Sequence, residues 1–440
     1  MISTVDRFVP PDERPELQRR TLRTLMIAQV MVGASLSGAF AGAALLAKEL
    51  SGRDSLAALA AAGAATGSAL SAVPLARLMA RRGRRHGLRT GYLIGLTGAT
   101  SAVVAAVSGF YPLLVVGLLL IGTSQAASLA TRFAAADLVD ETGRARAIST
   151  LVWTGTVGSV LGPSIALGFA GDLGEWLGLP RLAGPYVVTS VLLASAAVFV
   201  ELRLRPDPLV AVGGVDESDA DPGRVGRPRR STPLAETVAR IWGDPGARLA
   251  VVGMVVGHMV MVGIMVMTPL HMKDGNQALR IIGLVISLHI IGMYAFSPLS
   301  GWLTGRLGSR PVLALAGGVL LAGATVAGRT DPTDRAGMFV GLFLIGLGWS
   351  FSLISASALV TQRFDVKHRV EVQGVADLAM TGFGALAGIS SGTIVELADY
   401  RLLTQVGSAL AVGLVVMAVV NWMRIQRRGE PVRVPVATEY

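Results

Sequence analysis

Methionine and histidine are concentrated in one short stretch of this 440-residue sequence. Between Met254 and Met293 lie seven of its 15 methionines and three of its five histidines, and the chain contains no cysteine. Thioether sulfur is a soft ligand that selects Cu(I), whereas Mg²⁺ and Mn²⁺ prefer oxygen ligands and Zn²⁺ is bound well by nitrogen or thiolate. The stretch therefore predicts a copper site built without thiolates.

The spacing within this stretch places the candidate ligands on two helices. Met261 and Met265 are four residues apart, as are His289 and Met293, and residues four apart lie on one face of an α-helix. His258 extends the first stripe by three residues. If the two helices are antiparallel neighbours, a rise of 1.5 Å per residue puts both pairs roughly 10–20 Å below their shared end. The predicted ligands are Met261, Met265, His289 and Met293, with His258 as an auxiliary ligand.

The copper prediction includes a possible entry point, and it has an alternative explanation. His271 and Met272 follow at the outer end of the first helix and are candidates for an outer capture point. Methionine is also a flexible filler of apolar interiors, so packing is the alternative explanation for the methionine stripe. Ionisable residues inside a membrane are costly and usually functional, although a histidine can simply bond a neighbouring helix.

The elements that carry these residues are those of a membrane protein. The chain is 52% hydrophobic and 15% charged, and apolar runs of about 20 residues, long enough to cross a bilayer, recur along it. In lipid such runs must be helical, because each backbone polar group has to be satisfied within its own segment. The predicted fold class is all-α and integral membrane. The twelve expected segments are 22–47, 55–79, 87–109, 111–138, 147–171, 184–203, 247–272, 280–303, 310–328, 337–360, 371–396 and 401–424.

Basic residues indicate how the segments are oriented. The net charge is +10, and arginines such as Arg81 and Arg306 cluster in alternate loops, after the second and eighth segments among others. This bias places those loops and both termini in the cytoplasm of a cell-membrane protein, and it gives no reason to expect nucleic-acid binding. The expected regions are a cytoplasmic tail (1–21), a six-helix half (22–204), a cytoplasmic linker (205–246), a second six-helix half (247–424) and a second tail (425–440).

An internal repeat relates the two halves. The loop from Ala76 to Arg85 aligns with the loop from Gly301 to Arg310 at a constant offset of 225 residues. Two related halves of this kind are the plan of an alternating-access carrier. Both loops resemble the Major Facilitator signature, Gly-x-Leu-x-Asp-Arg-x-Gly-Arg-Arg, and the resemblance implies a Major Facilitator fold with twelve helices over essentially the whole chain. The acidic position is Ala80 in the first loop and Gly305 in the second, so the latch formed by charge pairing is expected to be weaker or built differently.

The methionine and histidine pairs suggest a subfamily. Met261-x-x-x-Met265 followed by His289-x-x-x-Met293 resembles the paired motifs of the CcoA-like copper importers. The resemblance implies copper import, with these four residues as ligands. The known branch also uses cysteines, which this chain lacks, and a related branch imports riboflavin. Import of a small organic molecule such as riboflavin, with methionine and aromatic residues as an apolar lining, is the alternative hypothesis.

A third hypothesis concerns the fifth segment. Gly158-x-x-x-Gly162-Pro163 resembles the antiporter signature of drug/proton exchangers, which would imply proton-coupled drug efflux. The alternative is a site of close helix packing and kinking, since glycine permits the close approach of a neighbouring helix and proline frees a backbone carbonyl.

Charged residues inside or near the segments are candidates for gating or coupling. Asp377 and Asp137 could bind a proton or pair with arginine, and a structural ion pair is the alternative. Arg84, Arg85 and His86 are expected to be solvated loop residues. The gating candidates are Asp377, Asp137, Arg132, Arg81 and Arg306.

No nucleotide-binding, metal-hydrolase or nucleophile signature occurs in the loops. We therefore expect a transporter rather than an enzyme, without a resident cofactor. It is expected to act as a monomer in the lipid bilayer on copper or another small-molecule substrate.

Overall fold

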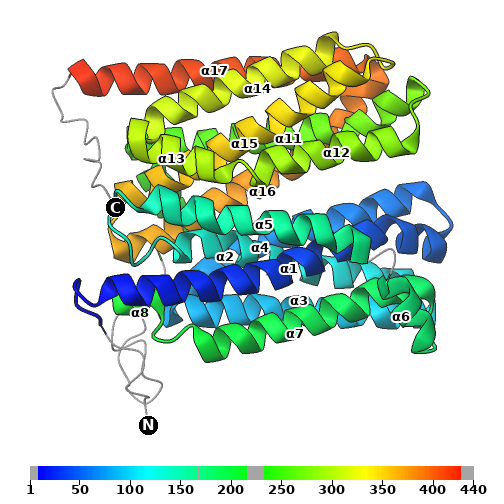
Figure 1. The fold of residues 1–440 in the computed structure, drawn as a ribbon, viewed down its shortest axis with the longest axis horizontal. Helices are drawn as coiled ribbons and strands as arrows, with labels where there is room; N and C mark the ends of the chain where they lie inside the picture. Colours follow the sequence, from blue (N-terminus) through cyan, green and yellow to red (C-terminus); the bar gives the residue numbers. More distant parts are fainter. Residues whose placement is uncertain (1–7, 166–168, 216–231, 428–440) are drawn as a thin grey trace. The chain divides into compact units, whose positions relative to one another are not determined.

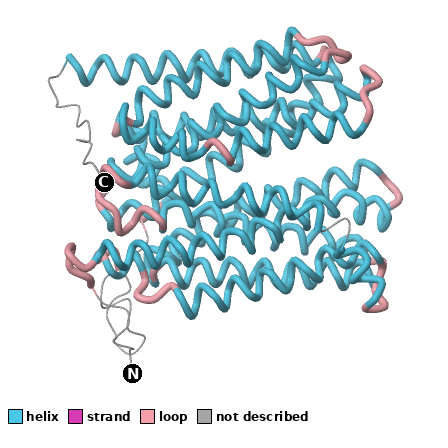
Figure 2. The backbone as a smooth tube through the Cα atoms, viewed as in Figure 1, coloured by secondary structure: helices cyan, strands magenta, loops and turns pink. Residues whose placement is uncertain are grey.

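The computed structural model describes residues 8–165, 169–215 and 232–427. Every regular element in these residues is a helix, and no strand occurs among them (Figures 1 and 2). Most neighbouring helices among the described residues are joined by loops of a few residues. The predicted all-α fold class is confirmed.

The helices of the first half of the chain include the long elements expected from the sequence and several short ones. They are α1 (Arg14–Ser51), α2 (Asp54–Arg82), α3 (Arg84–Ser108), α4 (Tyr111–Ala134), α5 (Arg144–Ile165), α6 (Gly171–Trp176), η2 (Arg181–Ala183), α7 (Gly184–Arg203) and α8 (Pro208–Ala211).

The second half begins with a short helix before its first long one. Its helices are α10 (Leu234–Gly243), α11 (Pro245–Asp274), α12 (Leu279–Tyr294), α13 (Ser297–Leu307), α14 (Ser309–Arg329), α15 (Arg335–Arg363), α16 (Val366–Leu397) and α17 (Tyr400–Arg427). The segment predicted over 280–303 is thus divided between α12 and α13, with the break at Ala295 and Phe296.

Ten helical spans among the described residues are long and apolar enough to cross a membrane. The other two predicted segments, 55–79 and 147–171, fall on α2 and α5. The second of these includes residues 166–168, which lie outside the described residues. The chain is therefore a multi-pass membrane protein.

The helices form two compact units. The first unit comprises Met1–Val139, Val157–Thr237 and Asp365–Leu378, and the second comprises Asp140–Thr156, Val238–Phe364 and Ala379–Tyr440. Each unit thus includes the beginning of one helix from the other half of the sequence. α16 begins in the first unit and α5 begins in the second, so residues that are distant in the chain meet inside one unit.

Glycines allow backbones to touch within the first unit, where α2 packs on α4 and α3 packs on both α4 and α7. A Cβ atom on Gly67 would lie 1.9 Å from the carbonyl oxygen of Leu119, and one on Gly122 would lie 2.2 Å from that of Ala64. Membrane helices approach this closely where small residues line the contact. The packing of α2 on α4 therefore depends on both glycines.

In the second unit, α15 is the central packing partner. α11, α12 and α14 all pack along it, and α14 also packs on α17. The contact of α12 with α15 is far more extensive than its contact with α11. The residues of α12 that the sequence predicts to bind metal are therefore positioned mainly by α15.

The predicted linker, 205–246, contains the short helices α8 and α10, while residues 216–231 lie outside the described residues. The predicted tails are partly helical: α1 begins at Arg14 and α17 runs to Arg427. The remainder of each tail, 1–7 and 428–440, lies outside the described residues.

Candidate functional site

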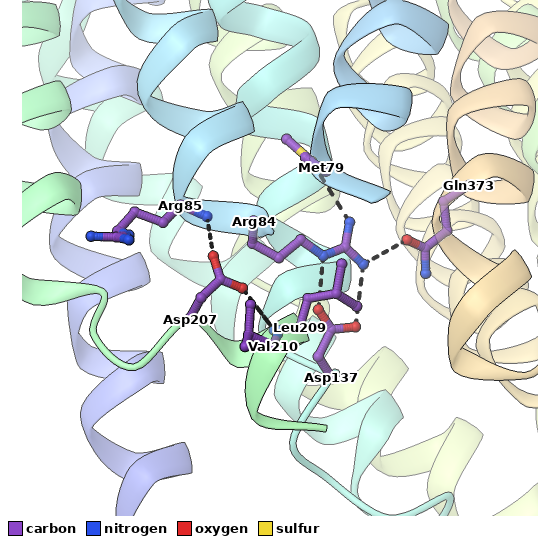
Figure 3. A network of polar contacts seen from close by, with 8 residues as sticks. All are labelled: Met79, Arg84, Arg85, Asp137, Asp207, Leu209, Val210 and Gln373. Atoms are coloured by element: carbon purple, nitrogen blue, oxygen red, sulfur yellow. Dashed lines mark hydrogen bonds and ion pairs between the residues drawn. The ribbon is translucent and has the colours of Figure 1, made fainter. Parts of the chain in front are cut away.

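Arg84, the first residue of α3, forms a buried ion pair with Asp137, which lies just after α4 (Figure 3). The Arg84 Nε donates to Asp137 Oδ2 at 2.8 Å, and Nη2 donates to Oδ1 at 3.2 Å. The same Nη2 donates to Gln373 Oε1 on α16 at 2.8 Å. A guanidinium that meets both oxygens of one carboxylate is held in a single geometry. The network therefore joins α3, the end of α4 and the beginning of α16.

A second carboxylate, that of Asp207, binds backbone groups beside this pair (Figure 3). Its Oδ2 accepts a hydrogen bond from the Arg85 backbone N–H at 2.7 Å, and its Oδ1 accepts from the backbone N–H groups of Leu209 and Val210 at 2.9 and 3.4 Å. The first turn of a helix leaves such N–H groups without an intrahelical partner. One buried carboxylate thus caps both α3 and α8.

Gly83 makes the approach of Asp207 possible. Its φ of 89° lies in a region that residues with a side chain rarely adopt. A Cβ atom at this position would lie 2.5 Å from Asp207 Oδ2. Gly83 of the first signature loop therefore allows both the turn between α2 and α3 and the close approach of the Asp207 carboxylate.

The prediction that Arg84 and Arg85 are solvated is wrong, because their side chains are buried, with Arg84 1% exposed and Arg85 7% exposed. The acidic position of the signature is Ala80, and the carboxylates come instead from Asp137 and Asp207, outside the loop. Asp207 is not among the residues singled out from the sequence, although the Asp207-Pro208 pair marks it as a helix N-cap. An aspartate followed by proline is typical of a helix N-cap and first helical residue.

A second buried ion pair joins Arg132 on α4 to Asp377 on α16. Nη2 of Arg132 bonds to Asp377 Oδ1, and Nη1 lies 3.5 Å from Oδ2. Two of the predicted gating residues therefore meet each other, and a third, Asp137, meets Arg84. Gln373, four residues before Asp377 on the same helix, had no distinguishing signal in the sequence.

The other two gating candidates lie on the surface. Arg81 is exposed at the end of α2, and Arg306 is exposed near the end of α13. The Arg306 guanidinium lies 5.4 Å from the centroid of the Trp302 ring, one turn earlier on the same helix. This is a local cation–π contact at an exposed site.

Three rings from three helices form a cluster in the second unit. His258 on α11 lies next to Trp349 on α15, with ring centroids 6.3 Å apart, and Tyr294 on α12 meets Trp349 edge to face at 5.7 Å. The indole N–H of Trp349 donates to His258 Nδ1 at 3.0 Å. Since Nδ1 accepts this bond, its lone pair is used by Trp349. We call His258, Tyr294 and Trp349 the ring cluster.

His289 is fully buried on α12 and is oriented by α15. Its Nδ1 lies 2.7 Å from the carbonyl oxygen of Leu342, so Nδ1 carries the proton and donates it. Its Nε2 is also buried and has no hydrogen-bond partner among the described residues. A histidine whose Nδ1–H bonds a backbone carbonyl presents an unprotonated Nε2, as in many metal sites.

The predicted methionine ligands differ in exposure. Met261 and Met293 are buried, and Met265 is partly exposed. At the proposed outer capture point, Met272 is fully buried. His271 stacks on Tyr400, with ring centroids 4.1 Å apart, so its ring is held against α17.

The glycines of the fifth segment lie against α1. A Cβ atom on Gly158 would lie 2.8 Å from the backbone nitrogen of Ala34, and one on Gly162 would lie 2.5 Å from the Ser37 side chain. The side chain of Pro163 lies outside the described residues. The contacts of the two glycines are those of close helix packing.

Taken with the repeat, the multi-pass helical fold and its buried charge pairs define the class of the protein as a membrane transporter. The family model of the Major Facilitator Superfamily matches residues 25–389 and 251–438. The chain belongs to this superfamily, and it is a transporter rather than an enzyme.

The chain is similar to two named bacterial transporters. It is 36% identical over 415 residues to the MFS-type transporter YdeG of Bacillus subtilis (strain 168), covering 94% of each chain. It is 28% identical over 313 residues to the riboflavin transporter RfnT of Brucella anthropi, covering 69% of this chain and 72% of that one.

Solved structures share its fold at low sequence identity. The fucose:proton symporter FucP of E. coli matches with a TM-score of 0.68 at 15% identity, covering 91% of this chain and 98% of the symporter. This similarity confirms the predicted Major Facilitator fold.

Proposed function

We propose that the protein moves a small planar organic molecule, of the class to which riboflavin belongs, by alternating access across the cell membrane. The observation that carries this proposal is the ring cluster. Tyr294 and Trp349 offer aromatic edges and faces, and His258 adds a polar group held by the Trp349 N–H. Apolar and aromatic walls with a few fixed polar groups are typical of sites for small organic ligands.

Two further observations support this cargo. The riboflavin transporter RfnT is 28% identical to the chain over 313 residues, and the match covers 69% of the chain. The Nδ1 atom of His258 already accepts a hydrogen bond, so this atom suits a role in fixing a ring better than one in binding a metal. In this proposal the chain acts as a monomer, with both termini and the central linker in the cytoplasm.

The two ion pairs supply the conformational control in this proposal. Arg84 and Arg132 bind carboxylates at the predicted cytoplasmic ends of their helices, and both networks reach the first part of α16. Opening a path to the cytoplasm would separate α16 from α3 and α4, and would break these bonds. The pairs would then hold the carrier closed on this side until bound cargo offsets their loss.

Copper is a second candidate, and one observation favours it. The Nε2 atom of His289 is buried with a free lone pair, and its orientation is set by the Leu342 carbonyl. Met261 and Met293 add buried thioethers on α11 and α12. This donor set suits Cu(I). In this alternative, copper would be cargo rather than a resident cofactor.

Uptake into proteoliposomes tests both cargoes with the same variants. For the organic cargo, Trp349→Leu is expected to reduce riboflavin uptake about 2- to 10-fold, the loss of about 0.5–1.5 kcal/mol of aromatic contact. Trp302→Leu is the control, because Trp302 is 55% exposed on α13. The organic proposal is wrong if the wild-type protein accumulates neither riboflavin nor another flavin.

For copper, His289→Ala and Met261→Leu are expected to abolish Cu(I) uptake. Met338→Leu is the control, because Met338 is also fully buried but lies on α15 outside the predicted ligand set. Copper uptake that survives both His289→Ala and Met261→Leu would exclude this site.

A further inference from the structure

The short helix α10 precedes the membrane helix α11 and has an unusual surface. Its side chains Leu234, Val238 and Trp242 are 42%, 42% and 56% exposed, although all three are apolar. They are spaced four residues apart, so successive side chains are turned by about 40° and form one stripe. We call these three residues the α10 stripe.

The other sides of α10 face either the rest of the protein or water. Thr237 and Ile241 are buried, 3% and 2% exposed, and lie next to the stripe on the helical wheel. Thr237 lines a small cavity together with Arg77 and Glu371, and Leu234, the first residue of the stripe, borders the same cavity. The charged residues Glu236 and Arg240 are exposed on the side opposite the stripe. Around the helix, the side that faces protein therefore lies between the apolar stripe and the charged side.

Both ends of α10 are held by ion and hydrogen-bond contacts. At its start, the Thr232 backbone N–H donates to the Glu371 carboxylate at 3.1 Å. After its end, Asp244 accepts hydrogen bonds from the Ala247 N–H at 2.7 Å and from Arg363 Nε at 3.0 Å. Burial opposes the ionisation of Asp244, but the bonds from Arg363 and Ala247 outweigh it and lower the pKa of this carboxyl. The position of the stripe is therefore set by its surroundings.

The α10 stripe lies next to the start of a helix that can span the membrane. α11 begins at Pro245, two residues after α10 ends at Gly243, and α11 is long and apolar enough to span the membrane. α10 has ten residues and is about 15 Å long, too short to span a bilayer. Trp242, at the end nearest α11, is the residue type enriched where hydrocarbon meets lipid headgroups.

We propose that the α10 stripe inserts into the bilayer at the headgroup boundary, in the leaflet where α11 begins. The helix lies in the plane of the membrane, with the α10 stripe in the acyl region and Glu236 and Arg240 in water. Arg240 lies near the headgroup level, which favours anionic lipids. Through Thr232 and Glu371, this helix connects the bilayer surface to the beginning of α16.

The absence of native cysteine makes the test direct, since an introduced cysteine is the only site of thiol labelling. Val238→Cys and Trp242→Cys place an environment-sensitive fluorophore on the stripe, and Glu236→Cys places it on the opposite side as a matched control. The labelled proteins are reconstituted in vesicles of phosphatidylcholine with phosphatidylglycerol. Quenching by spin-labelled lipid and by aqueous iodide is then compared, and transport by each variant verifies that it is folded.

At positions 238 and 242 we expect blue-shifted emission, quenching by the lipid probe and several-fold weaker quenching by iodide than at position 236. Equal iodide quenching at positions 236 and 238 would place the stripe in water and overturn the proposal. Protection of position 238 from both quenchers, or a disulfide between copies of the Val238→Cys protein, would show that protein covers the stripe, and would also overturn it.

Discussion

Arg132 on α4 and Asp377 on α16 form a buried ion pair although 245 residues separate them in the chain. Their side chains are 2% and 7% exposed. Both residues lie in the first compact unit, because the beginning of α16 belongs to that unit while the rest of α16 belongs to the second. Any motion that withdraws the start of α16 from α4 must break this pair.

Removing one partner of this pair is expected to be worse than removing both. Arg132→Met or Asp377→Leu leaves a buried charge without its partner, which costs about 3–5 kcal/mol. The double variant leaves neither charge and should lose less stability than either single variant. Thermal unfolding of the purified proteins measures these differences. If the loss in the double variant equals the sum of the single losses, the two residues do not act as a pair.

Arg84→Lys is expected to lower stability and impair transport. Lysine cannot meet both oxygens of Asp137 and also reach Gln373, so charge-assisted hydrogen bonds worth about 1.5–3 kcal/mol are lost. The same substitution at Arg82, which is exposed two residues earlier, provides the control. Unfolding temperature and uptake rate are compared for the two variants. Equal behaviour of Arg84→Lys and Arg82→Lys would contradict the role of the buried network.

Gly301 and Gly305 lie one turn apart on α13, in the second signature loop, but their surroundings differ. A Cβ atom on Gly301 would lie 2.1 Å from the Ser149 hydroxyl oxygen and 3.0 Å from the Ala145 carbonyl oxygen, whereas one on Gly305 would meet nothing within 4 Å. Gly301→Ala is therefore expected to reduce both unfolding temperature and uptake. Gly305→Ala should be neutral or stabilising by up to about 1 kcal/mol, the difference in helix propensity. Similar results for both variants would argue against the packing of α13 on α5.

Gly384 and Gly382 provide a matched pair for the ring cluster. A Cβ atom on Gly384 would lie 2.2 Å from Cδ2 of His258, whereas one on Gly382 would meet nothing within 4 Å. Gly384→Ala should displace the His258 ring and weaken its bond to Trp349. We expect a several-fold higher KM for the transported molecule, with Gly382→Ala unchanged. A KM unaffected by Gly384→Ala would mean that the orientation of His258 does not matter for cargo binding.

The class of fold could be predicted from the sequence because the bilayer limits the possible structures. Apolar runs of about 20 residues must become helices in lipid, so composition and run length determined the all-α membrane fold. The repeat of Ala76–Arg85 at Gly301–Arg310 indicated two related halves. Local patterns were sufficient for these conclusions because the backbone N–H and C=O groups of each helix form hydrogen bonds within that helix.

The sequence also identified Arg132, Asp137 and Asp377 as unusual charges, but it could not assign their partners. The partners depend on which helices approach each other, and α16 brings Gln373 and Asp377 to α3 and α4 from the far half of the chain. The same approach buries Arg84, which the loop sequence alone suggested to be solvated. Local pattern was misleading here because burial is set by these distant helices.

In the second unit, the sequence indicated which residue types could bind a ligand, and the tertiary structure decided how their atoms are used. Helical spacing placed Met261 near Met265 and His289 near Met293. Only the packing of α11 and α12 on α15 directs the Nδ1 atom of His258 to Trp349 and that of His289 to the Leu342 carbonyl. The spacing of side chains along a helix is local, but the group that meets a polar atom comes from another helix. Tertiary contacts alone therefore determine which nitrogen of each histidine makes these hydrogen bonds.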